Sequence, residues 1–474
     1  MDSVELRLSS AAGRWVLTAT VLGSGLAMLD ATIVNVALPT IGRDLQAPLS
    51  GLQWTITGYT LSLAALILLG GALGDRYGRR RIFILGVIWF AVASLLCAGA
   101  QTVGWLAGAR VLQGVGGALL TPGSLALIQA SFAPEDRARA VGAWSGLSGV
   151  AAAVGPFLGG WLIQGPGWRW AFLANVPVAA VVVAVTLRRV PESRDETASG
   201  RFDVLGTVVG ALSLAAVTYA LIVAAQPGRS GIAVGAGALG VAFGIAFGLL
   251  QRRRHNPVLP LDVFASGQFR AVNVVTLVVY AALAGVFFLF IMQLQVVVGL
   301  SALAAGTAML PVTLLMLLLS ARAGALAQQI GPRWPMTVGT LLAAAGVLLM
   351  SRVDAYANYA RDVLPAAVLF GLGLSATVAP LTATVLATAE RRRAGIASGV
   401  NNAVARVAQL LAVAALPLLV GLSGDDYRSP AVFTAGFRMA MYLCAGGLLA
   451  GSVLSLLTIH DDALREVPAR PTIA

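Results

Sequence analysis

Apolar runs long enough to cross a lipid bilayer follow one another along almost the whole chain. Bilayer hydrocarbon is about 30 Å thick, so an α-helix needs about 20 apolar residues to cross it. With 58% hydrophobic and only 11% charged residues, the chain lacks the polar surface that a water-soluble fold requires. The sequence therefore predicts an all-α polytopic membrane protein.

Fourteen charge-poor runs of spanning length predict fourteen transmembrane helices. The first run follows two arginines, is longer than a signal-peptide core and lacks a convincing cleavage site, so we expect it to be retained. The runs cover residues 15–38, 52–73, 82–99, 105–130, 141–163, 170–187, 204–225, 231–250, 271–293, 302–321, 334–351, 362–388, 394–421 and 431–458.

Basic residues concentrate in alternate loops between these runs. The chain contains no lysine, so arginine supplies all 32 basic residues, which outnumber the 20 acidic residues and give a formal net charge of +12. If the N-terminus is cytoplasmic, cytoplasmic loops hold Arg76, Arg79, Arg80, Arg81, Arg137, Arg139, Arg188, Arg189, Arg194, Arg201, Arg252, Arg253, Arg254, Arg391, Arg392 and Arg393, and opposite loops hold Arg43, Arg169, Arg229, Arg352, Arg361 and Arg428. Because basic loops favour the cytoplasmic side, we predict that both termini are cytoplasmic. We expect these arginines to set orientation rather than to bind nucleic acid.

An internal repeat divides the chain. Residues 71–80 read GALGDRYGRR and residues 324–333 read GALAQQIGPR, each directly after a predicted helix. The repeat predicts two six-helix bundles with two inserted helices between them. The expected domains are residues 1–190 for the first bundle, 191–268 for a linker with two extra helices, 269–460 for the second bundle and 461–474 for a cytoplasmic tail.

The sequence lacks the usual signatures of an enzyme. A Walker A motif needs a lysine, and the chain has none. Cys97 and Cys444 lie far apart inside apolar runs, which favours buried small side chains over a disulfide or a metal site. We expect no catalytic residue, no metal site and no cofactor.

Asp30 stands alone in the first apolar run, within the sequence LDATIVNVALP of residues 29–39. A carboxylate in hydrocarbon must be protonated, paired with a cation or turned to a wet cavity. Each of these states suits proton coupling, whereas a carboxylate that merely bridges helices is the structural alternative.

Arg110 lies at a depth compatible with Asp30, near the outer start of the fourth run. Arg110, Gln113, Gly114 and Gly117 share one helix face because their spacing is i, i+3, i+4 and i+7. We predict that Arg110 pairs with Asp30, since pairing lowers the cost of burying either charge. A static pair that only holds helices together is the alternative.

Two glycine-containing motifs complete the pattern. Residues 71–81 form a short loop whose Asp75 can accept hydrogen bonds from Arg76 or Arg79. In the fifth run, Gly155-Pro156-Phe157-Leu158-Gly159-Gly160 combines small residues, which allow close helix packing, with a proline that permits a bend.

These four motifs resemble the fourteen-helix drug:proton antiporter branch of the major facilitator superfamily, over essentially the whole chain. The resemblance implies two bundles that rock about a central cavity in a bacterial cytoplasmic membrane. It also implies inward proton flow that drives export of small apolar or cationic compounds, with the bilayer, protons and a small molecule as partners. An exporter of a dedicated lipid or metabolite and a facilitator-type importer are the alternatives, and the sequence is compatible with a monomer.

The resemblance assigns roles to particular residues. Proton coupling falls to Asp30 and Arg110. The conformational latch comprises Gly71, Asp75, Arg76, Gly78 and Arg79, with the start of the thirteenth helix, residues 395–399, as its expected partner, and Gln328 replaces the acid in the second copy. The helix-bend motif comprises Gly155, Pro156, Gly159 and Gly160. Candidate cavity residues are Asn35, Tyr59, Gln113, Tyr280, Phe287, Phe288 and Arg406, of which Arg406 marks either an anionic-substrate contact or an unpredicted partner.

Overall fold

The structure is a computed structural model that describes residues 6–194, 203–254, 257–388 and 394–464. Arg201, Arg391, Arg392, Arg393 and most of the expected tail therefore lie outside the described residues. The helices are α1 Ala11–Asp44, α2 Leu49–Tyr77, α3 Arg79–Ala98, α4 Val103–Ser131, α5 Pro134–Gln164, α6 Arg169–Leu173, α7 Asn175–Arg189, α8 Val204–Ala224, α9 Ser230–Arg253, η1 Leu261–Ala265, α10 Gly267–Met292, η2 Gln293–Val297, α11 Ala302–Ala308, α12 Leu310–Ile330, α13 Arg333–Met350, η3 Tyr359–Val363, α14 Leu364–Ala387, α15 Ala394–Leu419, η5 Asp426–Arg428, α16 Pro430–Thr458 and η6 Asp461–Leu464.

The predicted number of membrane spans is confirmed, because fourteen described segments are long and apolar enough to cross a bilayer. Some spans consist of two consecutive helices, such as α11 and α12, which meet at Met309. Pro311 follows this junction in the first turn of α12, where its missing N–H leaves no helical hydrogen bond unmade. The spans also extend past the predicted runs, because polar residues continue the helices beyond the apolar stretch, as in α1.

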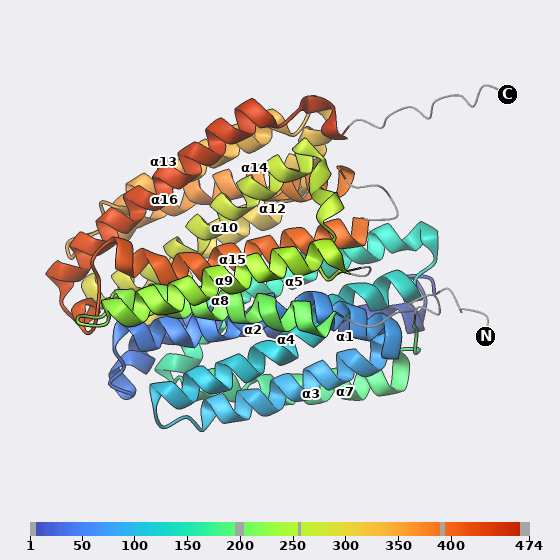
Figure 1. Cartoon of the computed structure of the whole chain (residues 1–474), viewed down its shortest axis with the longest axis horizontal. Helices are drawn as coiled ribbons and strands as arrows, with labels where there is room; N and C mark the ends of the chain where they lie inside the picture. Colours follow the sequence, from blue (N-terminus) through green and yellow to red (C-terminus); the bar gives the residue numbers. More distant parts are fainter. Residues whose placement is uncertain (1–5, 195–202, 255–256, 389–393, 465–474) are drawn as a thin grey trace.

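The long helices run side by side in two groups (Figure 1). One group contains α1 to α7, in which α4 packs on α2 and α3 while α1 packs on α5. The other contains α10 to α16, in which α14 packs on α12 and α13 while α10 packs on α15. We call the interface between the groups the seam, formed by α1, α2 and α5 on one side and α10, α11 and α15 on the other.

Corresponding loops of the two groups show that the repeat extends to structure. Gly78 and Gly331, which are in register in the repeated sequence, both have positive φ, at 110° and 93°. A Cβ on Gly78 would lie 2.8 Å from the carboxylate of Glu192, and one on Gly331 would lie 2.5 Å from Asp461. In each group, an acidic residue that follows the last long helix thus lies against the equivalent glycine of the repeat.

A basic side chain makes the same contact in both loops. Arg80 donates to the carbonyl of Val190 at 3.1 Å, just after α7, and Arg333 donates to the carbonyl of Leu456 at 2.7 Å, in the last turns of α16. Each donor therefore ties the loop between the second and third helices of its group to the end of the sixth. These matched contacts support the twofold relation that the sequence repeat predicts.

The inserted helices α8 and α9 form a hairpin that contacts both groups, since α8 touches α2 and α15. Gly240 and Gly244 of α9 approach Val217 and Ser213 of α8, whereas a Cβ on Gly248 would meet nothing within 4 Å. α9 therefore packs closely on α8 through Gly240 and Gly244.

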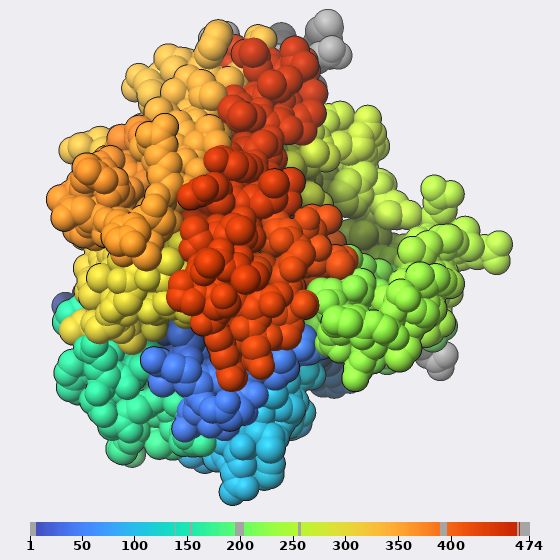
Figure 2. Space-filling view, turned by 90° about the vertical axis from the view of Figure 1, so that its left-hand side faces the viewer, coloured from blue at the N-terminus to red at the C-terminus, as the bar shows by residue number. Residues whose placement is uncertain are grey.

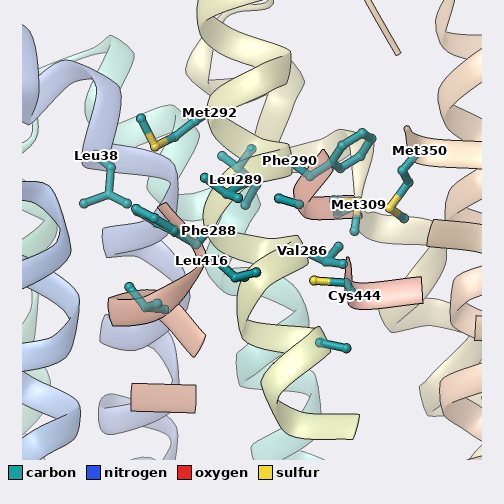
Figure 3. Close-up of a cluster of buried hydrophobic side chains, with 14 of the residues drawn as sticks. Leu38, Val286, Phe288, Leu289, Phe290, Met292, Met309, Met350, Leu416 and Cys444 are labelled. Carbon is teal, nitrogen blue, oxygen red and sulfur yellow. The ribbon is translucent and has the colours of Figure 1, made fainter. Parts of the chain in front are cut away.

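The largest apolar cluster fills the second group and reaches across the seam. Figure 3 shows Phe288 of α10 between Leu38 of α1 and Leu416 of α15. Phe288 is almost fully buried, so this candidate cavity residue lies in the apolar core of the described structure.

Hydrogen bonds across the seam gather at one end of the bundle. Gln53 donates to the carbonyls of Val413 and Ala414 at 2.9 and 3.1 Å, and Tyr427 donates to the carbonyl of Ala47 at 2.8 Å. Figure 2 views this end and shows the orange-red segment before and within α16 lying against blue residues of the first group. We call this end, which includes residues 42–53 and 413–428, the closed end.

Candidate functional site

A buried ion pair joins α1 to α4 inside the first group. Arg110 Nη1 contacts Asp30 Oδ2, and each residue is 1% exposed. The predicted pair is therefore present. Because neither side chain reaches water, each charge depends on the other for compensation.

Amide and hydroxyl groups complete the coordination of this pair. Gln113 donates to Asp30 Oδ1 at 2.8 Å, and Asn175 donates to the same oxygen at 3.0 Å. Both amides also donate to Ser94 Oγ, at 2.8 and 3.2 Å. Asp30 is thus held by donors from α4 and α7, with Ser94 of α3 behind them.

The guanidinium of Arg110 has further partners in α2. Its Nε donates to the carbonyl of Thr55 at 3.0 Å, and its Cζ lies 4.4 Å from the ring centroid of Tyr59. The face of α4 that carries Arg110 can approach α2 closely because Gly114 and Gly117 lie against Tyr59. The helix face that Arg110, Gln113, Gly114 and Gly117 share, as predicted, therefore packs on α2 and α1.

Sequence reasoning found Asp30, Arg110 and Gln113 but gave no role to Ser94 or Asn175. Asn175 was the more visible of the two, because it is an amide at the start of an otherwise apolar span. Ser94 carries no such signal, since serine is common in membrane helices and often bonds only to its own backbone.

The predicted loop of residues 71–81 is largely helical, because α2 continues to Tyr77 and α3 begins at Arg79. We keep the name α2–α3 loop for the residues around Gly78, where the expected interaction is present and Arg79 Nε donates to Asp75 at 2.8 Å. The backbone of this loop is held by the segment after α7, because Glu192 accepts from Arg80 N at 3.0 Å and Ser193 O accepts from Arg79 N at 2.8 Å. The expected partner segment 395–399 places Gly399 against Leu68 of α2. The latch role of this loop stays a prediction, and the contact with Glu192 was not foreseen.

The glycine-proline motif of α5 lies where three helices meet. A Cβ on Gly155 would collide with Thr32 of α1. A Cβ on Gly159 would be tightly packed against Ile33 of the same helix. A Cβ on Gly160 would lie 2.4 Å from the Cα of Leu303 in α11. The motif therefore permits close packing within the first group and across the seam, while α5 continues as one helix through Pro156.

The other candidate cavity residues are spread along the seam. Asn35 donates to the carbonyl of Ala31 in its own helix. Tyr280 and Phe287 are partly buried on α10, and Arg406 is partly buried near the middle of α15. Their contact with a substrate stays a prediction.

A separate cavity of about 700 Å³ opens at the closed end of the seam. Its lining includes Arg43 from α1, Gln164 from α5, Gln295 from η2 and Arg428 from η5. No group of three or more potential metal ligands occurs among the described residues.

Two groups of membrane-spanning helices related by an internal repeat, with a charged network buried in one of them, define a polytopic helical membrane transporter fold. The sequence model of the Major Facilitator Superfamily matches residues 20–413 and, in an overlapping match, 275–474. The chain belongs to this family, whose members are transporters. The resemblance to its drug-antiporter branch, inferred from the four motifs, is confirmed.

Relatives of known name cover nearly the whole chain. The chain is 35% identical to the puromycin resistance protein of Streptomyces alboniger, over 96% of this chain and 95% of that protein. It is 33% identical to the methylenomycin A resistance protein of Bacillus subtilis, over 96% of each. It is also 34% identical to the tetracenomycin C resistance and export protein of Streptomyces glaucescens, over 86% of this chain and 76% of that protein.

Solved structures share the fold at low sequence identity. A bacterial homolog of the human lysosomal transporter Spinster, in an inward-facing unoccupied conformation, aligns with a TM-score of 0.67 at 18% identity, over 95% of this chain and 97% of that one. The POT family transporter PepTSo aligns with a TM-score of 0.67 at 14% identity, over 94% of this chain and 97% of that one. These likenesses establish the fold class of the chain.

Proposed function

We propose that this protein exports small drug-like compounds in exchange for protons across the bacterial cytoplasmic membrane. The observation that carries the proposal is the buried network of Asp30, Arg110, Gln113 and Asn175. It occurs in a chain that is similar over nearly its whole length to proteins named for antibiotic resistance. Small apolar compounds and cations are the substrates that the family resemblance implies.

The geometry suggests how one proton could be exchanged. Both carboxylate oxygens of Asp30 are engaged by donors, so a proton reaches the carboxylate only when these contacts loosen. The network joins α1 to α2, α3, α4 and α7, so a shift of α1 relative to these helices would disturb it. Because α1 also lies on the seam, rocking of the two groups would produce that shift.

The direct test is transport in inverted vesicles with an imposed pH gradient. The parent should accumulate a substrate against its gradient, and Asp30→Asn, which mimics the protonated acid, should retain substrate binding but lose pH-driven accumulation. If Asp30→Asn keeps an undiminished dependence on the imposed pH gradient, the proton site lies elsewhere. Equilibration of the substrate without accumulation, and without any pH dependence, in the parent would favour a facilitator.

Membrane orientation requires its own measurement. We propose that both termini are cytoplasmic, which places the closed end on the outer side, because α1 ends there. A reporter enzyme that works only in the cytoplasm should be active when it is fused after residue 470. A periplasmic reporter would contradict the proposal that both termini are cytoplasmic.

A further inference from the structure

Arg406 is a cationic side chain near the middle of α15 that forms no ion pair with any acid in the described part of the chain. Its Nη1 donates only a long hydrogen bond of 3.3 Å to Gln409 of the same helix, and its buried Nε has no hydrogen-bond partner among the described residues. Every described carboxylate except Asp30 lies in a loop or in the terminal turns of a helix. A charge inside a membrane span is costly, so an uncompensated one indicates a functional contact.

Helix geometry directs Arg406 towards the first group. Gly399 of α15 lies against Leu68 of α2, and the carbonyl of Val413 accepts a hydrogen bond from Gln53 of α2. Arg406 is seven residues from each of these positions, and seven residues are close to two complete helical turns. Arg406 therefore lies on the α2-facing side of α15, between the two contacts.

Arg406 lies on the seam, because the contacts of α15 on either side of it are with α2. Asp30 is the one described acid that lies inside a membrane span away from the helix ends. Asp30 is buried and already neutralised by Arg110. An organic cation at this level would meet an uncompensated guanidinium, whereas an anion would complete its hydrogen bonding.

The cavity at the closed end also carries positive charge. It is lined by Arg43 and Arg428, together with the amides of Gln164 and Gln295. Arg428 contacts Asp425, but Arg43 forms no ion pair within the described part of the chain. A compound that moves along the seam would therefore meet guanidinium groups at the level of Arg406 and again at the closed end.

We infer that Arg406 binds an anionic group of the transported compound, so that the substrates are apolar molecules bearing a carboxylate, phenolate or similar anion. This inference rests on the proposed export function and narrows it. It replaces the cationic part of the substrate class that the family resemblance implies.

A pair of dyes with one framework and opposite charge tests the inference. Fluorescein is anionic and rhodamine 123 is cationic, while both share a phenyl-xanthene core. In fluorescence-anisotropy titrations of the purified full chain, the parent should bind fluorescein more tightly. Arg406→Gln should weaken fluorescein binding about tenfold and leave rhodamine 123 binding unchanged or stronger, because only the anion loses a charge-assisted hydrogen bond.

Conservative and distant variants separate charge from structure. Arg406→Lys should retain most of the fluorescein affinity, and Arg406→Met replaces Arg406→Gln if the latter does not elute as folded protein. Arg322→Gln, which changes an exposed arginine of α12, should alter neither affinity. If Arg406→Gln weakens the binding of both dyes equally, Arg406 has a structural role and the inference is overturned.

The outcome for the parent distinguishes this inference from the proposed function. Failure of the parent to bind fluorescein, or tighter binding of rhodamine 123, overturns the anionic assignment. If rhodamine 123 is then exported in vesicles in a pH-dependent way, the proposed antiport stands with a different substrate class. If neither dye nor a wider set of antibiotics is moved by a pH gradient, the proposed function itself is wrong.

Discussion

At the scale of single residues, Arg110 connects most of the buried network. It donates to Asp30, to Gln113 and to the carbonyl of Thr55, and its guanidinium lies over the ring of Tyr59. Asn175 makes fewer contacts in this network, because it donates only to Asp30 and to Ser94. Removing these two side chains should therefore have different consequences.

We predict that Arg110→Ala lowers the free energy of unfolding by about 3–5 kcal/mol, because it leaves the Asp30 carboxylate buried and unpaired. Asn175→Ala should cost only about 1–2 kcal/mol, since Asp30 keeps Arg110 and Gln113. Thermal and denaturant unfolding of the purified variants measures both. Equal losses would show that the ion pair contributes no more than a neutral hydrogen bond.

At the scale of elements, two acids act on the loop between α2 and α3 in different ways. Asp75 is 41% exposed and pairs with Arg79 one helical turn away. Glu192 comes from the segment after α7, accepts from the backbone of Arg80 and lies near the Arg80 and Arg81 side chains. Glu192 therefore ties distant segments together, whereas Asp75 is available for a contact in another conformation.

These positions predict separable effects. Asp75→Asn should slow export without changing substrate binding or stability, because its exposed pair with Arg79 contributes little to folding. Glu192→Gln should lower stability by about 1 kcal/mol, since charge-assisted hydrogen bonds become neutral ones. Gln328→Ala is the matched variant in the second group and should change neither property. Unaltered export by Asp75→Asn would remove the latch role.

The packing of α5 on α11 gives a second prediction for an element. Gly160→Val should abolish export, because its side chain would collide with Leu303 when the closed end forms. Gly149→Val is the control in the same helix, where a Cβ would meet nothing within 4 Å. Vesicle transport and the amount of folded protein measure both variants. Normal export by Gly160→Val would mean that close approach of α5 and α11 is dispensable.

At the scale of the whole molecule, the two groups are joined at one end. All cross-seam hydrogen bonds among the described residues lie at the closed end or in the adjoining turns, including that from Gln295 to the carbonyl of Val36. At the opposite end, Gly78 and Gly331 are engaged by acids of their own groups. Within the described part of the chain, the hydrogen bonds that hold the two groups together therefore lie at the end where α1 ends.

Cross-linking at the closed end should trap this conformation. Gln46→Cys combined with Arg428→Cys, whose parent side chains form a hydrogen bond of 3.2 Å, should react with a short bifunctional thiol reagent and stop export. Native Cys97 and Cys444 are buried, so they should not compete. Each single-cysteine variant should keep exporting after the reagent. Full export by the cross-linked double variant would show that this end need not open.

The sequence by itself determined the number of spans, the repeat and the pairing of Asp30 with Arg110. These features depend on properties that the chain carries locally, namely the length of apolar runs, repeated residues in register and the depth of a charge along a helix. A charge buried in hydrocarbon leaves few acceptable partners, so a single acid and a single arginine at similar depth could be matched.

Only the tertiary structure decided which helices meet and how they are rotated against one another. Ser94 and Asn175 join Asp30 because α3 and α7 turn those residues towards α1, and Glu192 reaches Arg80 because the segment after α7 passes the loop before α3. The same packing leaves Arg406 without an acid and closes one end of the seam. In a chain that is apolar on nearly every helix face, hydrophobic periodicity is too weak to specify these rotations, so polar contacts between distant helices set them.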